Sequence, residues 1–333
     1  MTGASSRPRV GFLGVGWIGL NRMNALAASG HAEIAAVADP NPDMVTAALI
    51  EAPDATPMTS LEDLLAFDLD GIVVATPSAL HADQAVAALE AGLAVFCQKP
   101  LGRSEAEARR VTDAARSADR LLGVDLSYRH TRGMEEVRRL IQSNALGRIF
   151  AADLTFHNAY GPDKPWFYDR KLAGGGCLMD LGTHLVDLAL WTLGFPEVEE
   201  VSGRLYAKAQ TAGPNDVEDY ATVRMLLETG AEVILACSWK LNAGQDADIS
   251  ATFYGENGAA RFRNINGSFY DFQAEHLVGT ERRSLVEPPD LWGGRAIVEW
   301  GEQLGVGNKF DPQIEKHLRA MQVLDHVYRA HAR

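Results

Sequence analysis

The segment Val10–Gly19 reads V-G-F-L-G-V-G-W-I-G, an apolar run that passes into G-x-G-x-x-G at Gly14, Gly16 and Gly19. A second apolar run follows and ends at Asp39, 20 residues beyond the last of these glycines. Glycines in this pattern allow a tight strand-to-helix turn and let the backbone approach a pyrophosphate, which then meets the free N–H groups of the helix. The segment therefore predicts a dinucleotide-binding βαβ unit. An ordinary glycine-rich turn is the alternative.

The turn and the acid predict which cofactor atoms are bound. We expect Gly14, Gly16, Trp17 and Ile18 to hold the pyrophosphate at the start of the helix. A carboxylate at Asp39 would accept hydrogen bonds from the ribose 2′-hydroxyl and repel a 2′-phosphate, and no arginine follows it closely. This favours NAD over NADP. Asp39 also fits a second and compatible role as the N-cap of the next helix.

Length and charge narrow the class of protein. The 333 residues exceed one domain of about 150 residues and fit two. A hydrophobic fraction of 47% is that of a globular protein with a substantial core. The net charge of -13 argues against binding to nucleic acid or to an anionic membrane surface, because a phosphate-binding surface needs a basic stripe. We expect neither partner.

The cysteines and the apolar runs bear on the compartment. Cys97, Cys177 and Cys237 are far apart and show no C-x-x-C spacing, so neither a disulfide framework nor a zinc site is predicted. The apolar stretch 10–20 is too rich in glycine for a signal peptide, and no apolar run reaches the ~20 residues of a membrane span. We expect a cytoplasmic protein.

The first part of the chain, residues 1–126, alternates short apolar runs with amphipathic segments. This alternation is typical of βαβ units on a doubly wound parallel sheet. The predicted strands are Arg9–Val15, Glu33–Asp39, Gly71–Ala75, Ala94–Gln98 and Leu121–Val124, and the predicted helices are Trp17–Ala28, Pro42–Leu49, His81–Ala91 and Ser104–Ala118.

The remainder, residues 127–333, has a different pattern. Successive β-type runs separated by turn residues predict a large open, mostly antiparallel sheet with helices, and hence an α+β domain. The predicted strands are Arg148–Phe156, Val201–Ala207, Tyr220–Glu228, Ala231–Trp239, Ile249–Gly255 and Ala259–Arg263, and the predicted helices are Met134–Ser143, Met179–Leu193 and Asp311–Ala330.

Two segments follow strands of the parallel sheet, at the edge where such sheets bind ligands. Thr76-Pro77 breaks the run that ends at Ala75 and exposes hydroxyl and backbone groups, although Ser78 as an N-cap explains the segment equally well. Lys99 ends a buried-looking run, so its ammonium would project over the nicotinamide end of the cofactor crevice. There it could bind a substrate hydroxyl and favour an alkoxide. A solvated lysine at a strand end is the alternative.

The third segment carries a carboxylate and an imidazole four residues apart. Asp180 and His184 would share one face of a helix, where the carboxylate orients the ring and raises its pKa, as suits a general acid/base. Asp187 lies near the same face and is a competing partner for the ring. A metal is not expected, since no third ligand is obvious. The glycines Gly174–Gly176, just upstream, would let a ligand approach the backbone. They therefore argue against the alternative that this segment is an ordinary core helix.

Taken in order, these motifs resemble those of the glucose–fructose oxidoreductase, inositol dehydrogenase and rhizopine catabolism (Gfo/Idh/MocA) family. The resemblance covers nearly the whole chain. It rests on G-x-G-x-x-G at 14–19, Thr76-Pro77 with His81, Lys99-Pro100, Ser127-Tyr128-Arg129, and Gly174–Gly176 followed by Asp180-x-Gly182-x-His184.

The resemblance implies a Rossmann domain, a second domain whose open sheet commonly packs against another subunit, and chemistry on a hydroxyl or carbonyl of a sugar, cyclitol or related polyol. Lys99 matches the family lysine that touches substrate and cofactor. His184 matches the proton acceptor and Asp180 its partner. Gln98 departs from the family's glutamate near the nicotinamide ribose but keeps a hydrogen-bonding amide, and Ser78 departs from a frequent asparagine.

We therefore expect an NAD-dependent oxidoreductase acting on a sugar, inositol or related polyol, in a homodimer or homotetramer formed through the C-terminal sheet. Lys99, Asp180 and His184 are the predicted catalytic residues. The strand-end residues predicted to bind the cofactor are Thr76, Pro77, His81, Gln98 and Lys99. Besides the catalytic residues, the predicted substrate contacts are Arg129, Asn158, Trp166, Phe167 and Tyr168; packing of the loop is the alternative for the aromatic residues.

Two other classes of function remain open at this point. One is a sugar- or nucleotide-sensing regulator on the same fold, against which the intact Lys99, Asp180 and His184 argue. The other is a redox-neutral lyase or glycosidase that uses tightly bound NAD transiently.

Overall fold

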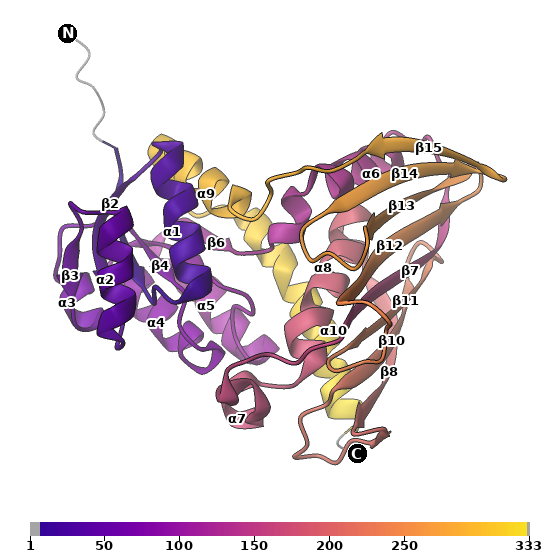
Figure 1. The fold of residues 1–333 in the computed structure, drawn as a ribbon, viewed down its shortest axis with the longest axis horizontal. Helices are drawn as coiled ribbons and strands as arrows, with labels where there is room; N and C mark the ends of the chain where they lie inside the picture. Colours follow the sequence, from indigo (N-terminus) through magenta and orange to yellow (C-terminus); the bar gives the residue numbers. More distant parts are fainter. Residues whose placement is uncertain (1–6, 332–333) are drawn as a thin grey trace, which may run out of the picture. The chain divides into compact units, whose positions relative to one another are not determined.

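The chain forms two compact units in a computed structural model, which describes residues 7–331. The first unit extends to Ser127 and also contains Gly293–Glu315, whereas the second consists of Tyr128–Trp292 and the residues from Lys316 onward. In Figure 1, helix α9 (Arg295–Val306) lies beside helix α1 (Trp17–Ser29), although the two are far apart in sequence.

The first unit is built on a parallel sheet of 6 strands in the order β3-β2-β1-β4-β5-β6. This is the strand order of doubly wound dinucleotide-binding sheets, in which the chain adds strands outward on one side of β1 and then on the other, beginning with β4. The predicted fold of this part is confirmed. The strands are β1 (Arg9–Leu13), β2 (Glu33–Ala38), β3 (Thr56–Met58), β4 (Gly71–Val74), β5 (Ala94–Cys97) and β6 (Leu122–Val124), and the helices besides α1 and α9 are α2 (Pro42–Glu51), α3 (Leu61–Leu65), α4 (Ser78–Glu90) and α5 (Glu105–Ala118).

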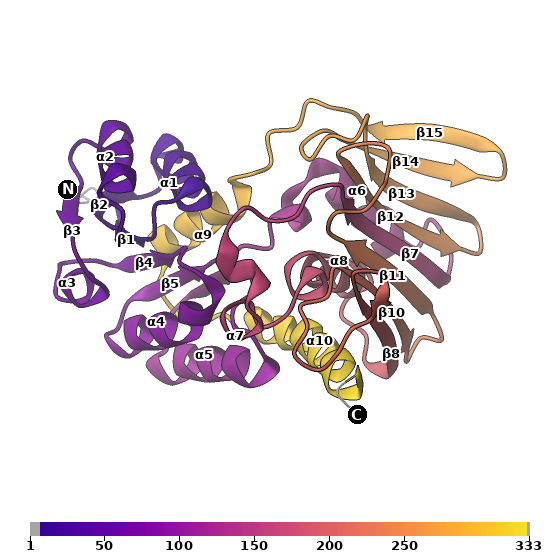
Figure 2. The ribbon, with the colours of Figure 1, turned by 60° about the horizontal axis from the view of Figure 1, so that its bottom comes forward.

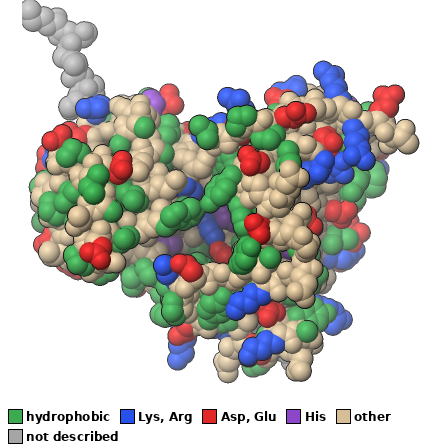
Figure 3. All heavy atoms as spheres, viewed as in Figure 1, with side chains coloured by type: hydrophobic (Ala, Val, Ile, Leu, Met, Phe, Trp, Pro, Cys, Tyr) green, Lys and Arg blue, Asp and Glu red, His purple; other side chains and the backbone are tan. Residues whose placement is uncertain are grey.

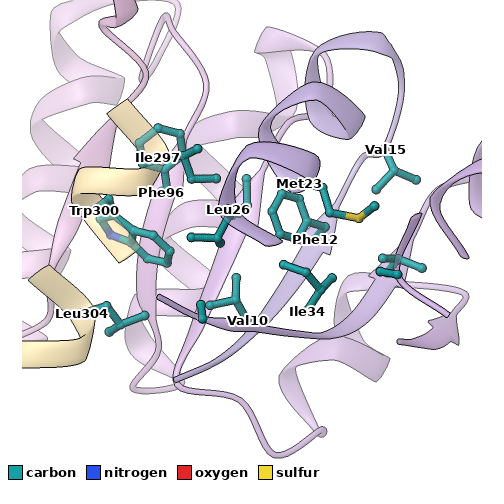
Figure 4. Close-up of a cluster of buried hydrophobic side chains, with 14 of the residues drawn as sticks. Val10, Phe12, Val15, Met23, Leu26, Ile34, Phe96, Ile297, Trp300 and Leu304 are labelled. Atoms are coloured by element: carbon teal, nitrogen blue, oxygen red, sulfur yellow. The ribbon is translucent and has the colours of Figure 1, made fainter. Parts of the chain in front are cut away.

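Helix α9 completes the hydrophobic core of the first unit. Figure 4 shows its Ile297, Trp300 and Leu304 grouped with Phe96 of β5 and with side chains of β1, β2 and α1. The sequence-based division places residues 293–315 in the second domain instead. The structure differs because the apolar face of α9 is buried against the parallel sheet.

Two glycines make room for the indole of Trp300. A Cβ at Gly71 of β4 would lie 2.9 Å from the ring, and a Cβ at Gly123 of β6 would lie 2.8 Å from it. Trp300 is 2% exposed and contacts Phe96 with ring centroids 5.8 Å apart. A large side chain so enclosed leaves a cavity when it is removed.

We expect Trp300→Ala to lower the free energy of unfolding by about 3–5 kcal/mol, as for other buried aromatic truncations. Urea denaturation followed by circular dichroism measures the change. Val306→Ala, on the same helix at a side chain that is 90% exposed, is the control and should stay within about 0.5 kcal/mol of the wild type. Equal stabilities of the two variants would mean that α9 does not belong to this core.

The second unit is built on a sheet of 9 strands in the order β15-β14-β13-β12-β7-β11-β10-β8-β9. All its pairs are antiparallel except β7 with β11. The predicted open, mostly antiparallel sheet is confirmed. The strands are β7 (Ile149–Asn158), β8 (Val198–Ala207), β9 (Gln210–Thr211), β10 (Tyr220–Leu227), β11 (Glu232–Ser238), β12 (Ala247–Gly255), β13 (Gly258–Asn264), β14 (Phe272–Val278) and β15 (Glu281–Val286).

Helices cover one face of this sheet. Figures 1 and 2 show α6 (Arg132–Gln142), α8 (Thr183–Thr192) and α10 (His317–His331) on the same side of the strands. Strand β10 alternates accordingly: Ala221, Val223 and Met225 are buried under the helices, whereas Arg224 is exposed on the other face. The alternation has the period of 2 expected for a sheet with one covered face.

The surface carries mixed charge. On the face drawn in Figure 3, acidic and basic side chains are interspersed, and hydrophobic side chains are scattered among them. Between residues 7 and 331, none of the helices is both long and apolar enough to span a bilayer.

Candidate functional site

The three glycines of the turn before α1 have different surroundings. Gly14 has φ 88°, and a Cβ there would meet the Ala75 carbonyl oxygen at 2.5 Å. A Cβ at Gly19 would meet the Gly14 oxygen at 2.2 Å, so this glycine lets the helix pack against the turn. A Cβ at Gly16 would meet nothing within 4 Å. The first and third glycines therefore serve the turn, and the second leaves its backbone open to a ligand, as a dinucleotide requires.

The N-terminus of α1 also suits an anion. Its N-cap, Gly16, has no side chain to fill the cap, and the first turn contains no acidic residue. The N–H groups of Trp17 and Ile18 belong to this turn, where backbone donors and the helix dipole favour negative charge. The residues present thus fit a bound pyrophosphate.

Asp39 follows β2 and links the turn to the next loop. One carboxylate oxygen accepts a hydrogen bond from the Val15 N–H at 2.9 Å, and the other accepts one from the Asn41 N–H at 2.9 Å. The N-cap of α2 is Asn41, whose side chain accepts from the Asp43 N–H, so the capping alternative for Asp39 does not apply. The carboxylate is held at the second strand end, where a ribose would lie in this fold.

His81 braces the two loops at the carboxyl ends of β4 and β5. Its ring is 1% exposed, with Nδ1 2.7 Å from the Pro100 carbonyl oxygen and Nε2 2.6 Å from that of Thr76. A neutral ring donates to one of these carbonyls, and only an imidazolium donates to both. Burial lowers the pKa of His81, while the two carbonyls oppose that change. His81 is therefore a buried link between the two loops that are predicted to bind the cofactor.

The segment around Thr76 and Lys99 lies at the carboxyl edge of adjacent strands. Thr76 donates its hydroxyl to Gln84 at 2.6 Å, and Pro77, not Ser78, is the N-cap of α4. Gln98 directly follows β5, and its amide donates to the buried Asp125 at 2.6 Å. Lys99 is half-buried just beyond it. The first unit thus gathers the predicted cofactor residues along one sheet edge, as the sequence indicates.

In the second unit, Asp180 and His184 do not lie on one regular α-helix. Asp180 is in a π-helical turn, Leu178–Gly182, and His184 is in the first turn of α8. The predicted helix Met179–Leu193 is therefore wound more widely at its start. Single π-turns are rare in proteins, and those that do occur are often found at functional sites.

Trp239 and Tyr128 surround this pair. The Trp239 indole N–H donates to the Asp180 carboxylate at 3.1 Å. The Tyr128 ring meets the His184 ring edge-on, with centroids 4.9 Å apart. Burial, and after it the charge of Asp180, raises the pKa of the Tyr128 hydroxyl. Sequence reasoning missed both roles, although Trp239 ends a predicted strand and Tyr128 belongs to the quoted Ser127-Tyr128-Arg129 motif.

The competing carboxylate, Asp187, has another partner. Arg129 forms a two-pronged ion pair with it, including an Nε–Oδ2 contact of 2.7 Å. Burial alone would raise the pKa of Asp187, but Arg129 and then His317 outweigh burial and lower it to about 2. The arrangement commits the Arg129 guanidinium to an internal carboxylate, and its role as a substrate contact stays a prediction.

The three glycines before the π-turn serve the protein's own packing. Gly174 caps helix α7 (Arg170–Ala173) in a left-handed conformation with φ 85°. A Cβ at Gly175 would lie 2.0 Å from the Tyr328 hydroxyl, and one at Gly176 would lie 1.9 Å from the Glu218 carbonyl oxygen. The expectation that these glycines let a ligand approach is replaced by close contacts within the second unit.

Glu218 anchors the start of the π-turn. This carboxylate is fully buried and accepts hydrogen bonds from the N–H groups of Gly176, at 2.8 Å, and Leu178, at 3.1 Å. The Tyr328 hydroxyl donates to the same oxygen at 2.7 Å. Burial raises the pKa of Glu218, against these hydrogen bonds. The sequence offers no local signal for this role, since the bonded groups are about 40 and 110 positions away.

The aromatic loop 166–168 packs against Trp239, which is hydrogen-bonded to Asp180. Tyr168 and Phe167 both meet the Trp239 ring edge-on, with centroids 5.8 and 6.2 Å away. Trp166 stacks on Phe167 at 3.8 Å. Asn158, at the end of β7, accepts a hydrogen bond from the Tyr160 N–H at 2.7 Å. The loop predicted to bind substrate is thus adjacent to the Asp180 anchor, and packing accounts for part of its aromatic character.

The part of the chain that the structure describes contains no group of three or more His, Cys, Asp and Glu side chains that could hold a metal ion. Around the π-turn, Asp180 supplies a carboxylate, His184 an imidazole and Tyr128 a phenol. These groups transfer protons and orient hydroxyl groups.

Comparisons with known proteins agree for both units. Residues 8–126 match the model of an oxidoreductase family with an NAD-binding Rossmann fold. Residues 134–261 match the model of the GFO/IDH/MocA C-terminal domain.

Individual relatives include two named dehydrogenases. The chain is 30% identical to the D-glucoside 3-dehydrogenase of Escherichia coli (strain K12) over 209 residues, which cover 59% of this chain but only 60% of that protein, less than two thirds of its length. It is 27% identical to an inositol 2-dehydrogenase of Corynebacterium glutamicum over 318 residues, or 87% of this chain and 90% of the relative.

A solved structure extends the likeness to the whole chain. The crystal structure of GenD2 from gentamicin A biosynthesis, in complex with NAD, superposes with a TM-score of 0.81 at 25% sequence identity. The superposition covers 98% of this chain and 95% of GenD2.

Proposed function

Because the chain belongs to the Gfo/Idh/MocA family of NAD-binding oxidoreductases, we propose that it transfers hydride between NAD and a hydroxyl or carbonyl group of a sugar, inositol or related polyol. Membership confirms the resemblance seen in the motifs. The observation that carries the proposal is the π-turn, where the indole of Trp239 binds Asp180 four residues before His184.

The residues take distinct roles in this proposal. His184 accepts the proton of the reacting hydroxyl, because an imidazole is a proton acceptor near neutral pH. Asp180 is its carboxylate partner, held in place by Trp239. Lys99 stabilises the negative charge that develops on the reacting oxygen. When bound, the nicotinamide supplies the acceptor for the hydride.

Binding of the dinucleotide falls to the first unit. The turn at Gly14 and Gly16 and the N–H groups of Trp17 and Ile18 would hold the pyrophosphate, and the loops of Thr76, Pro77 and Gln98 would line the nicotinamide end. His81 supports those loops from inside.

A substrate screen tests the proposal. The purified protein is incubated with a set of sugars and inositols and with NAD or NADP, and reduced nicotinamide is followed by its absorbance. Formation of reduced cofactor with one polyol supports the proposal. A product formed without net reduction indicates a redox-neutral lyase or glycosidase, and binding without any product indicates a sensor.

The preference for NAD over NADP depends on Asp39. Its carboxylate, held by two backbone N–H groups, would accept from the ribose hydroxyl and repel a phosphate there. We expect Asp39→Ala to reduce kcat/KM for NAD by about 10- to 100-fold, the worth of a hydrogen bond to a charged group, and to narrow the preference over NADP. Asp43→Ala, in the neighbouring helix, is the control. If Asp39→Ala kept the full preference for NAD over NADP, a residue other than Asp39 would determine that preference.

A second copy of the chain would cover the open face of the second unit's sheet. Ile234 of β11 is 48% exposed between Arg224 of β10 and Asp153 of β7, its partners in the ladder. On the same face, His157 stacks on Tyr220 with centroids 5.7 Å apart. Apolar and aromatic groups among charged ones are typical of protein interfaces.

We expect light scattering to give a mass two or four times the 36.1 kDa of one chain. Ile234→Arg should shift the protein toward the monomer, because it places a charge in the centre of the interface. Val306→Arg, at an exposed site of the first unit, should leave the mass unchanged. A monomeric wild type would contradict the assignment.

A further inference from the structure

A buried charged network lies at the carboxyl edge of the first unit's sheet. Arg22 comes from α1 and is 6% exposed, Gln98 follows β5 at 7%, and Asp125 follows β6 at 1%. The Arg22 Nε and the Gln98 Nε2 both donate to the same oxygen of Asp125, Oδ2, each at 2.6 Å. The other oxygen, Oδ1, has no partner among residues 7–331. These two N–H groups therefore share one buried acceptor, while Arg22 Nη1 donates to Asn21 Oδ1 at 2.6 Å.

The network joins the parts of the first unit that carry the proposed cofactor site. Arg22 is on the helix that starts at the glycine turn. Gln98 directly precedes Lys99, and its backbone N–H bonds to the Val74 oxygen at the end of β4. Asp125 is tied by its own N–H to the Cys97 oxygen at the end of β5. Asp125 thus connects helix α1 to the carboxyl ends of strands β5 and β6 through hydrogen bonds.

Lys99 is fixed on both sides as a consequence. On one side the Gln98 side chain is bound to Asp125, and on the other the Pro100 carbonyl contacts His81. Both anchors are buried and short, so the backbone that presents the lysine is restrained. Geometry held in this way is the support a catalytic side chain needs, because a displacement of about 1 Å can cost about 100-fold in rate.

We propose that Asp125 is a positioning residue that acts through Gln98 on Lys99 and through Arg22 on the start of the dinucleotide helix. The proposal rests on the proposed function in what it says of Lys99. The network contains one positive group, the Arg22 guanidinium, and one negative group, the Asp125 carboxylate. The neutral Gln98 amide donates to that same carboxylate. The geometry therefore also accommodates the exchange in which position 98 carries the carboxylate and position 125 the amide.

This exchange provides the test. Gln98→Glu alone sets two buried carboxylates against one arginine, and Asp125→Asn alone leaves Arg22 buried without a carboxylate; both states are unfavourable. The double variant Gln98→Glu/Asp125→Asn restores one of each charge. The four proteins are compared for thermal midpoint, for NAD dissociation constant by fluorescence titration, and for kcat on the polyol found in the screen.

We expect each single variant to lower kcat and to weaken NAD binding by roughly 10- to 100-fold, and the double variant to recover most of both. Measurements are made well below each variant's thermal midpoint, so that only folded protein is compared. Asp83→Asn, which removes an exposed partner of Arg110, is the matched control and should change none of the three quantities.

Two results would overturn the proposal. Single variants that lose thermal stability but keep wild-type kcat and NAD affinity would give the network a structural role only. A double variant no better than the two single effects combined would show that the charge is not shared between the positions. Failure of the proposed function is a separate result: the screen would then give no reduced nicotinamide with any polyol, whereas the thermal midpoint and NAD affinity would still report on the exchange.

Discussion

Replacing His184 by Asn should lower kcat by about 10²- to 10⁴-fold, the range that general acid–base catalysis contributes. His184 is 8% exposed and its ring packs against Tyr128; of the two nearby carboxylates in sequence, Asp187 is paired with Arg129, which leaves Asp180 as the proposed partner of the ring. An amide at this position keeps hydrogen-bonding groups but cannot take up a proton near neutral pH. Binding of NAD should change little, since the dinucleotide turn is in the other unit.

Lys99→Ala should have a comparable effect, of about 10²- to 10³-fold, through lost stabilisation of the developing charge. Steady-state kinetics on the substrate from the screen, together with NAD titration, measure both variants. His326→Asn and Lys309→Ala remove exposed side chains of the same types and should keep wild-type rates. Wild-type turnover of either active-site variant would contradict the assigned roles.

Acid should remove a defined part of the stability through Asp187. The pKa of Asp187 is about 2 in the folded protein, below the ordinary aspartate value of 3.8, because Arg129 and His317 outweigh burial. An acid with a lowered pKa stabilises the fold above its unfolded pKa and loses that effect as pH falls through the folded pKa. The shift corresponds to about 2 kcal/mol, present above about pH 4 and lost toward pH 2.

Asp187→Asn should remove this pH dependence and also lower the free energy of unfolding at pH 7 by about 3–5 kcal/mol, since Arg129 then lacks a buried partner. Urea titrations at pH 7, 4 and 3 measure both effects. Arg129→Lys keeps the charge without the two-pronged geometry and should cost less. A variant as stable as the wild type at every pH would show that the pair adds nothing to the fold.

The sequence predicts most elements whose hydrophobic pattern is strong. Strands β1, β2, β4 and β5 are near-continuous apolar runs, and strands β10 and β11 alternate, so both periods can be read directly. The glycine turn and the strand-end position of Lys99 follow from the same patterns. These features are local, which is why a single sequence contains them.

The missed elements lack a local signal or depend on distant partners. Strand β3 has three residues, one of them Pro57, and forms only through its pairing with β2. Strand β15, at one edge of the large sheet, begins with three charged residues, and β14 beside it has polar residues among its apolar ones. Helix α9 is amphipathic, but its place in the first unit depends on space left by two glycines far back in the sequence.

The site shows the same division. A spacing of four predicts that Asp180 and His184 are neighbours on an α-helix, but Asp180 lies in a π-turn that is hydrogen-bonded to the distant Glu218 and Trp239. The pairing of Asp187 with Arg129 joins residues 58 positions apart. Such long-range hydrogen bonds decide how the side chains are arranged, and a motif lists only the side chains themselves.

The return of α9 to the first unit makes the second unit an insertion in the chain. Residues 128–292 of the second unit are inserted between two segments of the first, and the rest of the second unit follows from Lys316 onward. A fragment cut at residue 126 would expose the sheet surface that Trp300 covers. Exchange of the second unit between relatives therefore requires a junction on each side of residues 128–292 and a third before the C-terminal helix.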